Sequence, residues 1–310
     1  MPNLTTVTLP AGLTGIPKDA FANSAQLATV NFKAADANTP SAKDGEANAI
    51  TLPTGITTID ANAFAGTAAT TMDLSKVTGL TMIDASVFQN MTKLATVTLP
   101  SGLTTINQSA FQNDAALKKL TQSNPSQARE ENDATPAEGT AKFGSKLTSI
   151  GNNAFYGTGF TTVDLSLAGG TQASAPSSGR AAAAAAATPN PLTVGSGAFT
   201  NMADLTTVKL PANSNIDPAN FGNPADATGT PKLQTIQYGT DSTTTTPATA
   251  TISNATISST NFSKITNKTI EIKSSVGNSG ITFTGGVFFG NTNLQTLKLS
   301  VTQTNGNAPL

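Results

Sequence analysis

The side chains that could do chemistry in this chain are its carboxylates, because its 310 residues include 18 Asp and Glu but neither His nor Cys. Without those two residue types the chain cannot build a Ser-His-Asp or Cys-His nucleophile, the usual zinc ligands or a disulfide framework. Two carboxyl groups roughly 5–9.5 Å apart are enough for glycoside hydrolysis. Asp60 and Asp84 are one candidate pair, and Asp73 and Asp164 are another. Whether either pair meets depends on the elements that carry it.

Those elements belong to a repeat, in which phenylalanines recur with an apolar residue five positions before each of them. The phenylalanines, which we predict to form the structural core, are Phe21, Phe64, Phe88, Phe111, Phe155, Phe199, Phe221, Phe262 and Phe288. Their apolar partners are Ile16, Ile59, Ile83, Ile106, Ile150, Val194, Ile216, Ile257 and Phe283. A match in every copy indicates a solenoid whose equivalent residues stack on one another.

Most copies also contain an apolar run of the form L-x-x-V-x-L, as in residues 94–99. Its alternating end predicts a short strand with one buried face, and a following proline such as Pro100 ends the pairing of that strand. Two residues after the phenylalanine, most copies have Asn or Gly, as at Asn90 and Gly157. These residues best tolerate φ > 0, so each coil is predicted to pass from strand to helical turn and back.

The best-preserved unit, residues 94–117, reads LATVTLPSGLTTINQSAFQNDAAL and spans 23 residues from one leading leucine to the next. This pattern resembles the BspA-like leucine-rich repeats, a class found on bacterial and protozoan surface proteins, although the cysteine often found after the phenylalanine is absent. The resemblance implies a leucine-rich-repeat solenoid, β-rich with short helical turns, of about nine coils of 23 residues. It also implies a ribbon of parallel strands on the concave side.

Four intervals between phenylalanines carry extra residues that are rich in Ala, Thr, Ser, Pro and Gly. Such a composition buries too little apolar surface to offset the entropy cost of ordering it, so we predict protruding loops. The predicted loop inserts are 33–49, 121–146, 167–191, 222–231 and 239–250. We expect 1–310 to be a single solenoid domain and a fragment of a larger surface protein, because the first copy opens directly in a strand run.

Alternate positions of the strand runs are predicted to face solvent, and they form the candidate binding face. They are Thr6, Thr8, Thr96, Thr98, Thr162, Asp164, Thr207, Lys209, Thr296 and Lys298. This face is mostly lined by hydroxyl groups. Because threonine is also a favourable strand residue, ordinary exposed strand positions are an alternative interpretation.

The repeat also sets the positions of the carboxylates. Asp60 and Asp84 are equivalent residues of neighbouring coils, but other copies mostly have Asn, Ser, Thr or Gly there, which share capping ability rather than acidity. Capping is therefore favoured over catalysis. Asp73 and Asp164 are expected to lie three coils apart, or roughly 14 Å, too far for a catalytic pair. The acidic stretch 129–133 lacks a calcium-loop pattern, and neither a metal nor a cofactor is expected.

Charge and hydropathy narrow the classes of partner. The net charge is −1 and no basic cluster appears in the sequence, so nucleic acid is not expected as a partner. No run of about 18 apolar residues is present, so direct insertion into a membrane is not expected either. We expect an extracellular or cell-surface location, with the signal peptide outside this chain.

Three functions remain open at this point. The first is a non-enzymatic adhesion module that binds an extracellular protein, such as a host matrix component, which is the partner class that the resemblance supplies. A glycan partner is possible, although the absence of Trp removes the rings that stack best on sugars. The alternatives are a structural spacer of a surface protein and a carboxylate-based glycosidase.

Overall fold

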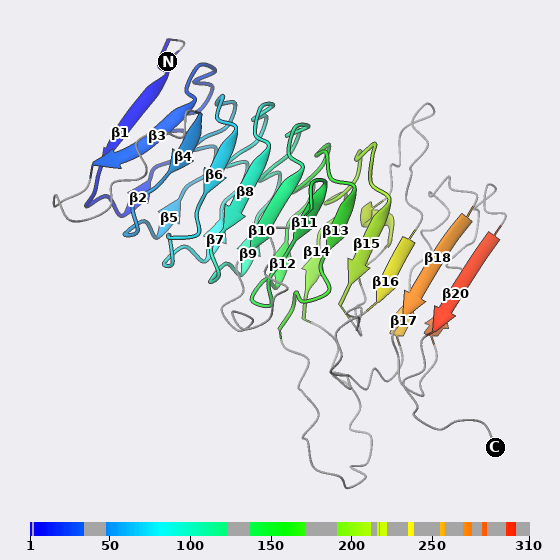
Figure 1. Ribbon diagram of the computed structural model, residues 1–310. Coiled ribbons are helices and arrows are strands. Elements are labelled where there is room, and N and C mark those ends of the chain that lie inside the picture. The colour runs from blue at the N-terminus through cyan, green and yellow to red at the C-terminus, as the bar shows by residue number, and fades with distance from the viewer. Residues whose placement is uncertain are drawn as a thin grey trace, which may run out of the picture.

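The computed structural model is a solenoid built almost entirely from short parallel strands (Figure 1). It describes residues 1, 3–33, 48–122, 137–170, 191–211, 216 and 218–221, together with the backbone of five further strands between 235 and 301. The predicted β-rich solenoid is confirmed.

The longer strands pair side by side in one sheet of 12 parallel strands, ordered as in the chain. They are β1 (Thr6–Pro10), β3 (Thr29–Lys33), β4 (Ala49–Thr51), β6 (Thr71–Asp73), β8 (Thr96–Leu99), β10 (Lys119–Gln122), β11 (Thr140–Lys142), β13 (Thr162–Asp164), β15 (Thr207–Leu210), β16 (Thr235–Tyr238), β18 (Thr269–Ser274) and β20 (Thr296–Val301). In β8, Val97 and Leu99 are buried and Thr96 and Thr98 are partly exposed, as the alternating pattern predicts.

Shorter strands form a second set of parallel ladders along another side of the solenoid. β2 (Gly15–Ile16) pairs with β5 (Thr58–Ile59), and β7 (Met82–Ile83), β9 (Thr105–Ile106), β12 (Ser149–Ile150) and β14 (Thr193–Val194) form a four-stranded ladder, while β17 (Ala255–Ile257) pairs with β19 (Ile281–Phe283). Every one of these strands ends in the apolar residue that precedes the phenylalanine by five positions. The apolar residues that recur five positions before the phenylalanines therefore lie on these ladders.

From Phe21 to Phe199, the segment around each phenylalanine of the stack is a series of hydrogen-bonded turns rather than the predicted helical turn. Around Phe64, the Ala63 N–H donates to the Asp60 carbonyl at 3.2 Å and the Ala65 N–H donates to the Asn62 carbonyl at 3.1 Å. Each of these bonds spans three residues, which closes a β-turn rather than a turn of α-helix. In the part of the chain that the structure describes, the only helix is the 3₁₀-helix η2 (Pro218–Phe221).

Left-handed backbone conformations explain why these segments form turns. In six coils, φ is positive both two residues before and two residues after the phenylalanine. The residues before it are Asp19, Asn62, Ser86, Ser109, Asn153 and Gly197, and those after it are Asn23, Gly66, Asn90, Asn113, Gly157 and Asn201. Positive φ at the third residue of a turn is typical of type II turns. The second set confirms the predicted Asn/Gly column, whereas sequence analysis missed the first.

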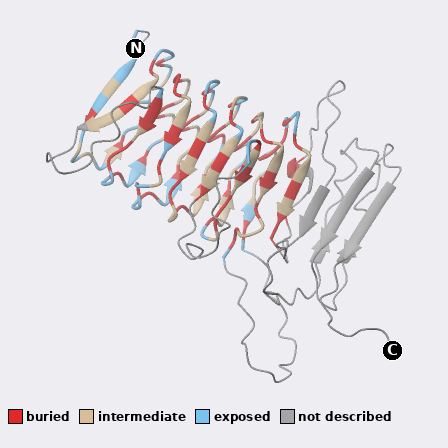
Figure 2. Ribbon diagram, in the orientation of Figure 1, coloured by how far each residue is buried: buried red, intermediate tan, exposed pale blue. Residues whose placement is uncertain are grey.

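Seven of the nine predicted core phenylalanines form a continuous stack through the interior, from Phe21 to Phe221. Their ring centroids lie 5.1–6.0 Å apart from one coil to the next. Phe21 is partly buried, and the other six are at most 2% exposed. Buried residues recur in coil after coil along the described part of the solenoid (Figure 2). Phe262 and Phe288 lie outside the described residues.

Insertions widen the sheet without interrupting this stack. The Phe111 N–H donates to the Ala154 carbonyl at 2.8 Å, so the turns of Phe111 and Phe155 are adjacent despite the insert between them. On the sheet side, however, β11 lies between the strands β10 and β13 that follow those turns. β4 lies between β3 and β6 in the same way. Between Phe21 and Phe155 the sheet side therefore has two more strands than the turn side has turns.

Two predicted loop boundaries are corrected by these additional strands. The predicted insert 121–146 contains β11, and the predicted insert 33–49 reaches into β3 and β4. Ala141 and Phe143 are buried, so the segment around β11 alternates like the other strands. The predicted insert 167–191 likewise begins inside the fold, at the buried Ala168. Residues 222–231 and 239–250, the remaining predicted inserts, lie outside the described residues.

Gln122 compensates for the break in the coil at the end of β10. Its side chain is buried, and its Nε2 donates to the Leu103 carbonyl at 2.7 Å. Its Oε1 accepts a hydrogen bond from the Gly144 N–H at 3.1 Å. One polar side chain therefore satisfies backbone groups of both coils that flank the insertion, where an apolar residue would leave them unpaired.

Candidate binding face

The register of the sheet places its outward positions in two rows that run across the strands. The first row is Thr6, Thr29, Ala49, Thr71, Thr96, Lys119, Thr140, Thr162 and Thr207. The second row is Thr8, Asn31, Thr51, Asp73, Thr98, Thr121, Lys142, Asp164 and Lys209. We call these two rows the ribbon face. Seventeen of its eighteen positions are polar, and Ala49 is the exception.

Eight of the ten residues predicted to line the face lie in these rows. The other two, Thr296 and Lys298, belong to β20, where the backbone register pairs Thr296 with Thr269 and Lys298 with Glu271. Glu271 pairs with Thr235, which pairs with Thr207, so Lys298 continues the first row and Thr296 lies two residues outside it. A shift by two residues keeps the alternation of faces, so the sequence pattern alone could not detect it.

The predicted binding face did not include the residues of β3, β4, β6, β10 and β11. The strands β4 and β11 overlap the predicted inserts, so their residues were assigned to loops. Residues 140–143 nevertheless alternate between polar and apolar side chains as in a strand. Lys142 is the residue most affected, because it lay within a predicted loop. The sequence signal for this strand is the pair of apolar residues Ala141 and Phe143 at alternate positions, and both are buried in the structure.

The acidic residues of the face are held by turns at the ends of their strands. The Ser75 N–H donates to Asp73 Oδ1 at 2.9 Å, and the Ser166 N–H donates to Asp164 Oδ1 at 3.1 Å. Asp164 also accepts a hydrogen bond from the Ser166 hydroxyl and faces Lys209, whose Nζ lies 3.8 Å from Asp164 Oδ2. The Lys209 and Asp164 side chains are 30% and 16% exposed. This ion pair is therefore partly screened by solvent and contributes little stability.

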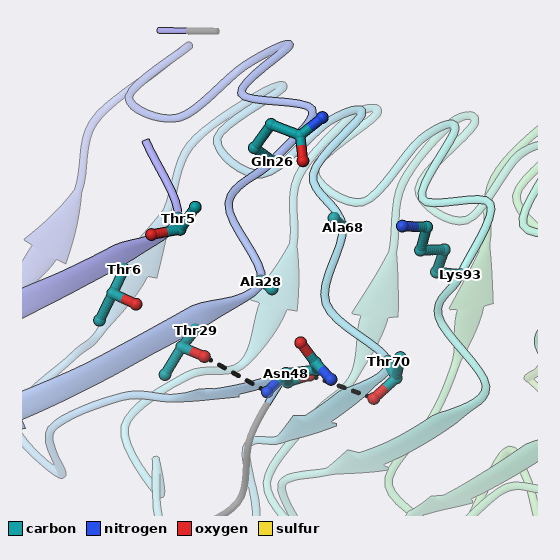
Figure 3. Close-up of a pocket in the computed structure, with 9 residues that line it drawn as sticks. All are labelled: Thr5, Thr6, Gln26, Ala28, Thr29, Asn48, Ala68, Thr70 and Lys93. Atoms are coloured by element: carbon teal, nitrogen blue, oxygen red, sulfur yellow. Dashed lines mark hydrogen bonds between the residues drawn. The ribbon is translucent and has the colours of Figure 1, made fainter. Parts of the chain in front are cut away.

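A polar depression of about 380 Å³ adjoins the start of the first row (Figure 3). It is lined by Thr5, Thr6, Gln26, Ala28, Thr29, Asn48, Ala68, Thr70 and Lys93. Asn48 lies between Thr29 and Thr70, where its N–H donates to Thr29 Oγ1 at 3.3 Å and its carbonyl accepts from Thr70 Oγ1 at 3.2 Å (Figure 3). The lining offers hydroxyl, amide and ammonium groups but no carboxylate, so it is a polar contact surface and not a carboxylate site.

The candidate catalytic carboxylates occupy structural positions. The Asp60 carbonyl accepts a turn hydrogen bond, and Asp84 Oδ1 accepts from the Ala85 N–H at 2.7 Å and from Asn107 Nδ2 at 3.3 Å. The Asp84 carboxylate is therefore engaged by its own turn and by the neighbouring coil. Asp73 and Asp164 are separated by four strand steps, through β8, β10 and β11, and not by three as predicted, because β11 was not counted. Four steps amount to roughly 19 Å.

Asp114 is a buried carboxylate away from the ribbon face. Its Oδ1 accepts a hydrogen bond from the Met91 N–H at 2.7 Å, and its Oδ2 is buried with no hydrogen-bond partner in the described structure. Burial raises the pKa of the Asp114 carboxyl well above its ordinary value, and the Met91 N–H opposes this in part. Because the Asp114 carboxyl group is buried and does not belong to the ribbon face, we expect it to affect the stability of the fold and not ligand binding.

The described residues contain neither a metal site nor a membrane-spanning helix. No group of three or more acidic, His or Cys side chains is arranged to hold a metal ion. Likewise, the described part contains no helix with the length and apolar character needed to span a bilayer.

No curated protein matches the chain. Among solved structures, it is similar to a leucine-rich repeat protein from Bacteroides ovatus, at 15% identity and a TM-score of 0.44, covering 96% of this chain and 74% of that one. It is also similar to the pneumococcal vaccine antigen PcpA, at 14% identity and a TM-score of 0.43, covering 96% and 68%. A leucine rich cell surface protein from Faecalibacterium prausnitzii matches at 18% identity and a TM-score of 0.27, covering 96% and 79%. These TM-scores are low, so the assignment of the chain rests on its repeats.

The repeats match the family model for the BspA type Leucine rich repeat region in six copies, over residues 1–41, 43–131 and 139–228. The predicted count of about nine coils is therefore somewhat too high, and its last two copies fall beyond the matched ranges. The matched ranges nevertheless cover well over half of the 310 residues and include the ribbon face from β1 to β15. The chain belongs to the BspA-type leucine-rich-repeat family.

Proposed function

We propose that this protein is a non-enzymatic recognition module, displayed at the cell surface, that binds an extracellular protein through the ribbon face. The observation that supports this proposal is the pair of rows on a parallel sheet in which every position but Ala49 is polar. Eleven of the eighteen ribbon-face positions are threonines, whose hydroxyl groups can donate and accept hydrogen bonds. A stacked interior holds these groups in fixed positions, which lowers the entropy cost of binding.

The test is binding of the purified chain to a panel of extracellular matrix proteins. In the test variant, Thr96, Thr98 and Lys209 are changed to Glu, which places three carboxylates on the ribbon face. The matched control changes Thr57, Thr81 and Lys76 to Glu, since these are two threonines and one lysine that are exposed away from that face. Saturable binding that is lost in the first variant and kept in the second is the expected result. Equal loss in both variants would contradict the proposal.

A structural spacer is the second candidate, favoured by the continuous phenylalanine stack, which makes the solenoid a stiff rod. A spacer would bind no member of the panel and would tolerate both sets of substitutions. Absence of binding combined with unchanged thermal unfolding in both variants would therefore favour the spacer.

A further inference from the structure

The lysines of the ribbon face gather in one part of it. We define the basic segment as the outward positions of β10, β11, β13 and β15, which comprise three lysines, one aspartate and four threonines. The lysines are Lys119, Lys142 and Lys209, and the aspartate is Asp164. The net charge of the basic segment is therefore +2. The ten outward positions of β1, β3, β4, β6 and β8 carry only Asp73, a net charge of −1.

This segment has the dimensions of a site for an extended ligand. With neighbouring strands about 4.8 Å apart, Lys119 and Lys209 are separated by three strand steps, or roughly 14 Å across the sheet. The exposed Lys118, just before β10, and the exposed Glu138, just before β11, carry opposite charges and leave the net charge of the segment unchanged. Sequence analysis found no basic cluster because these lysines lie in different coils, and only the pairing of the strands brings them together.

The chemistry of the segment favours a polysaccharide over a protein. Its outward positions include no aromatic or aliphatic side chain, and such side chains usually anchor protein interfaces. Instead, threonine hydroxyl groups alternate with ammonium groups. Hydroxyl groups match the hydroxyl groups of a sugar, and ammonium groups match carboxylates or sulfates spaced along a polymer.

From this arrangement we infer that the basic segment binds an acidic polysaccharide, laid across the strands from β10 to β15. The inference goes beyond the proposed function, because it assigns one part of the ribbon face a ligand of a different class. Lysine ammonium groups pair with the anionic groups of the polymer, and the neighbouring threonines contact its hydroxyl groups. The Asp164 carboxylate opposes binding, because it repels the polymer and engages Lys209 at 3.8 Å.

The first experiment measures binding of the whole chain to heparin, hyaluronan and dextran by calorimetry at two salt concentrations. We expect binding to heparin that weakens with salt, and no binding to dextran, which is uncharged. Binding to hyaluronan as well would show that carboxylates are sufficient for recognition, whereas binding to heparin alone would show that sulfates are required. Equal binding to dextran, or tighter binding to polyglutamate than to heparin, would overturn the inference.

Loss of charge provides the second test. The variant Lys119→Gln/Lys209→Gln is expected to raise the Kd for heparin about tenfold, as for the loss of two exposed ion pairs. The control Lys18→Gln/Lys76→Gln makes the same change in net charge at exposed lysines outside the ribbon face, and it should leave the Kd within about twofold. Equal weakening by both variants would show that only net charge matters and would overturn the site.

Gain of affinity provides the third test, with a pair of matched variants. Asp164→Asn and Asp73→Asn each remove one negative charge from an Asp-Leu-Ser strand end and keep the oxygen that accepts the serine N–H. Asp164→Asn should lower the Kd for heparin about threefold to fivefold, because its position lies within the basic segment, whereas Asp73→Asn should change it far less. No change with Asp164→Asn would contradict the inference. If a matrix protein binds the ribbon face and heparin does not, the inference fails while the proposed function stands.

Discussion

Two neighbouring columns of the turn are buried alike but differ in composition. The first is the phenylalanine stack, which has the same residue in every coil. The second, three residues later, is called here the third-residue column, and it consists of Ser24, Thr67, Met91, Asp114, Thr158 and Met202. All six are at most 5% exposed. Burial alone therefore does not determine residue type, and the local hydrogen bonds must decide what the second column accepts.

Those hydrogen bonds differ among the members of the third-residue column. The hydroxyl groups of Thr67 and Thr158 each donate to the carbonyl of the phenylalanine in their own coil at 2.9 Å. Asp114 instead accepts from the Met91 N–H of the neighbouring coil and leaves Oδ2 unpaired. A hydroxyl group is thus satisfied within its own coil, whereas the carboxylate depends on the neighbouring coil.

The largest expected effect comes from breaking the uniform column. Phe111→Ala removes a fully buried ring stacked between Phe88 and Phe155 at 5.1 Å from each, and should cost about 3–5 kcal/mol of unfolding free energy. Phe21→Ala, at a partly buried ring, should cost clearly less. Denaturant unfolding of both variants measures the difference. Equal costs for the two would show that the stack does not dominate stability.

The next largest effect is a gain in unfolding free energy, because Asp114 leaves a buried oxygen without a partner in the third-residue column. Asp114→Thr should stabilise the fold at neutral pH by about 1–2 kcal/mol. It removes a buried oxygen without a partner and supplies a hydroxyl group that can donate to the Phe111 carbonyl, and these gains outweigh the loss of the acceptor for the Met91 N–H. Thr158→Asp is the reciprocal change and should destabilise. Unchanged denaturation midpoints would show that the unpaired oxygen carries no cost.

The same carboxyl group makes stability depend on pH. Because burial raises the pKa of Asp114 in the folded protein, the neutral form is favoured on folding. Its contribution is fully present below the unfolded pKa of about 3.9 and is lost as the pH rises through the folded pKa. Relative to Asp114→Asn, whose side chain does not titrate, the parent protein should lose stability from acidic to neutral pH. Parallel stability curves for the two proteins would refute this assignment.

A smaller effect tests the hydroxyl members of the third-residue column. Thr158→Val keeps the shape but removes the hydrogen bond to the Phe155 carbonyl, and should cost about 1 kcal/mol. Thr158→Ser retains the hydroxyl group and serves as the control. If valine were as stable as threonine, the column would be selected by packing and not by hydrogen bonding.

The phenylalanine stack is uniform along the sequence, and such uniform columns are the part of the structure that the sequence predicts. The phenylalanines, their apolar partners and the Asn/Gly column recur at fixed spacing, and this periodicity predicted the class of fold and eight positions of the ribbon face. Sequence periodicity could not reveal β11, since Thr140–Lys142 follows an insert and adds a strand without adding a turn. It also could not reveal the basic segment, because proximity between lysines of separate coils depends on strand register. Both β11 and the basic segment depend on which strands of different coils pair, and the spacing of residues along the sequence does not specify that pairing.

The smallest predicted effect concerns the positive-φ residues that make both columns possible. Ser109 has φ of 57°, a conformation that costs a residue with a Cβ roughly 1 kcal/mol, partly offset in glycine by its larger unfolded-state entropy. Ser109→Gly should therefore stabilise by about 0.5 kcal/mol. Gly157→Ala, at φ of 72°, should destabilise by about 1 kcal/mol although an added Cβ would meet Asn113 Oδ1 only at 3.4 Å, an ordinary contact. Thermal unfolding of the two variants separates backbone strain from crowding. Opposite shifts would locate the energy in φ, whereas two shifts near zero would mean that the turns are determined by the packing of the coils.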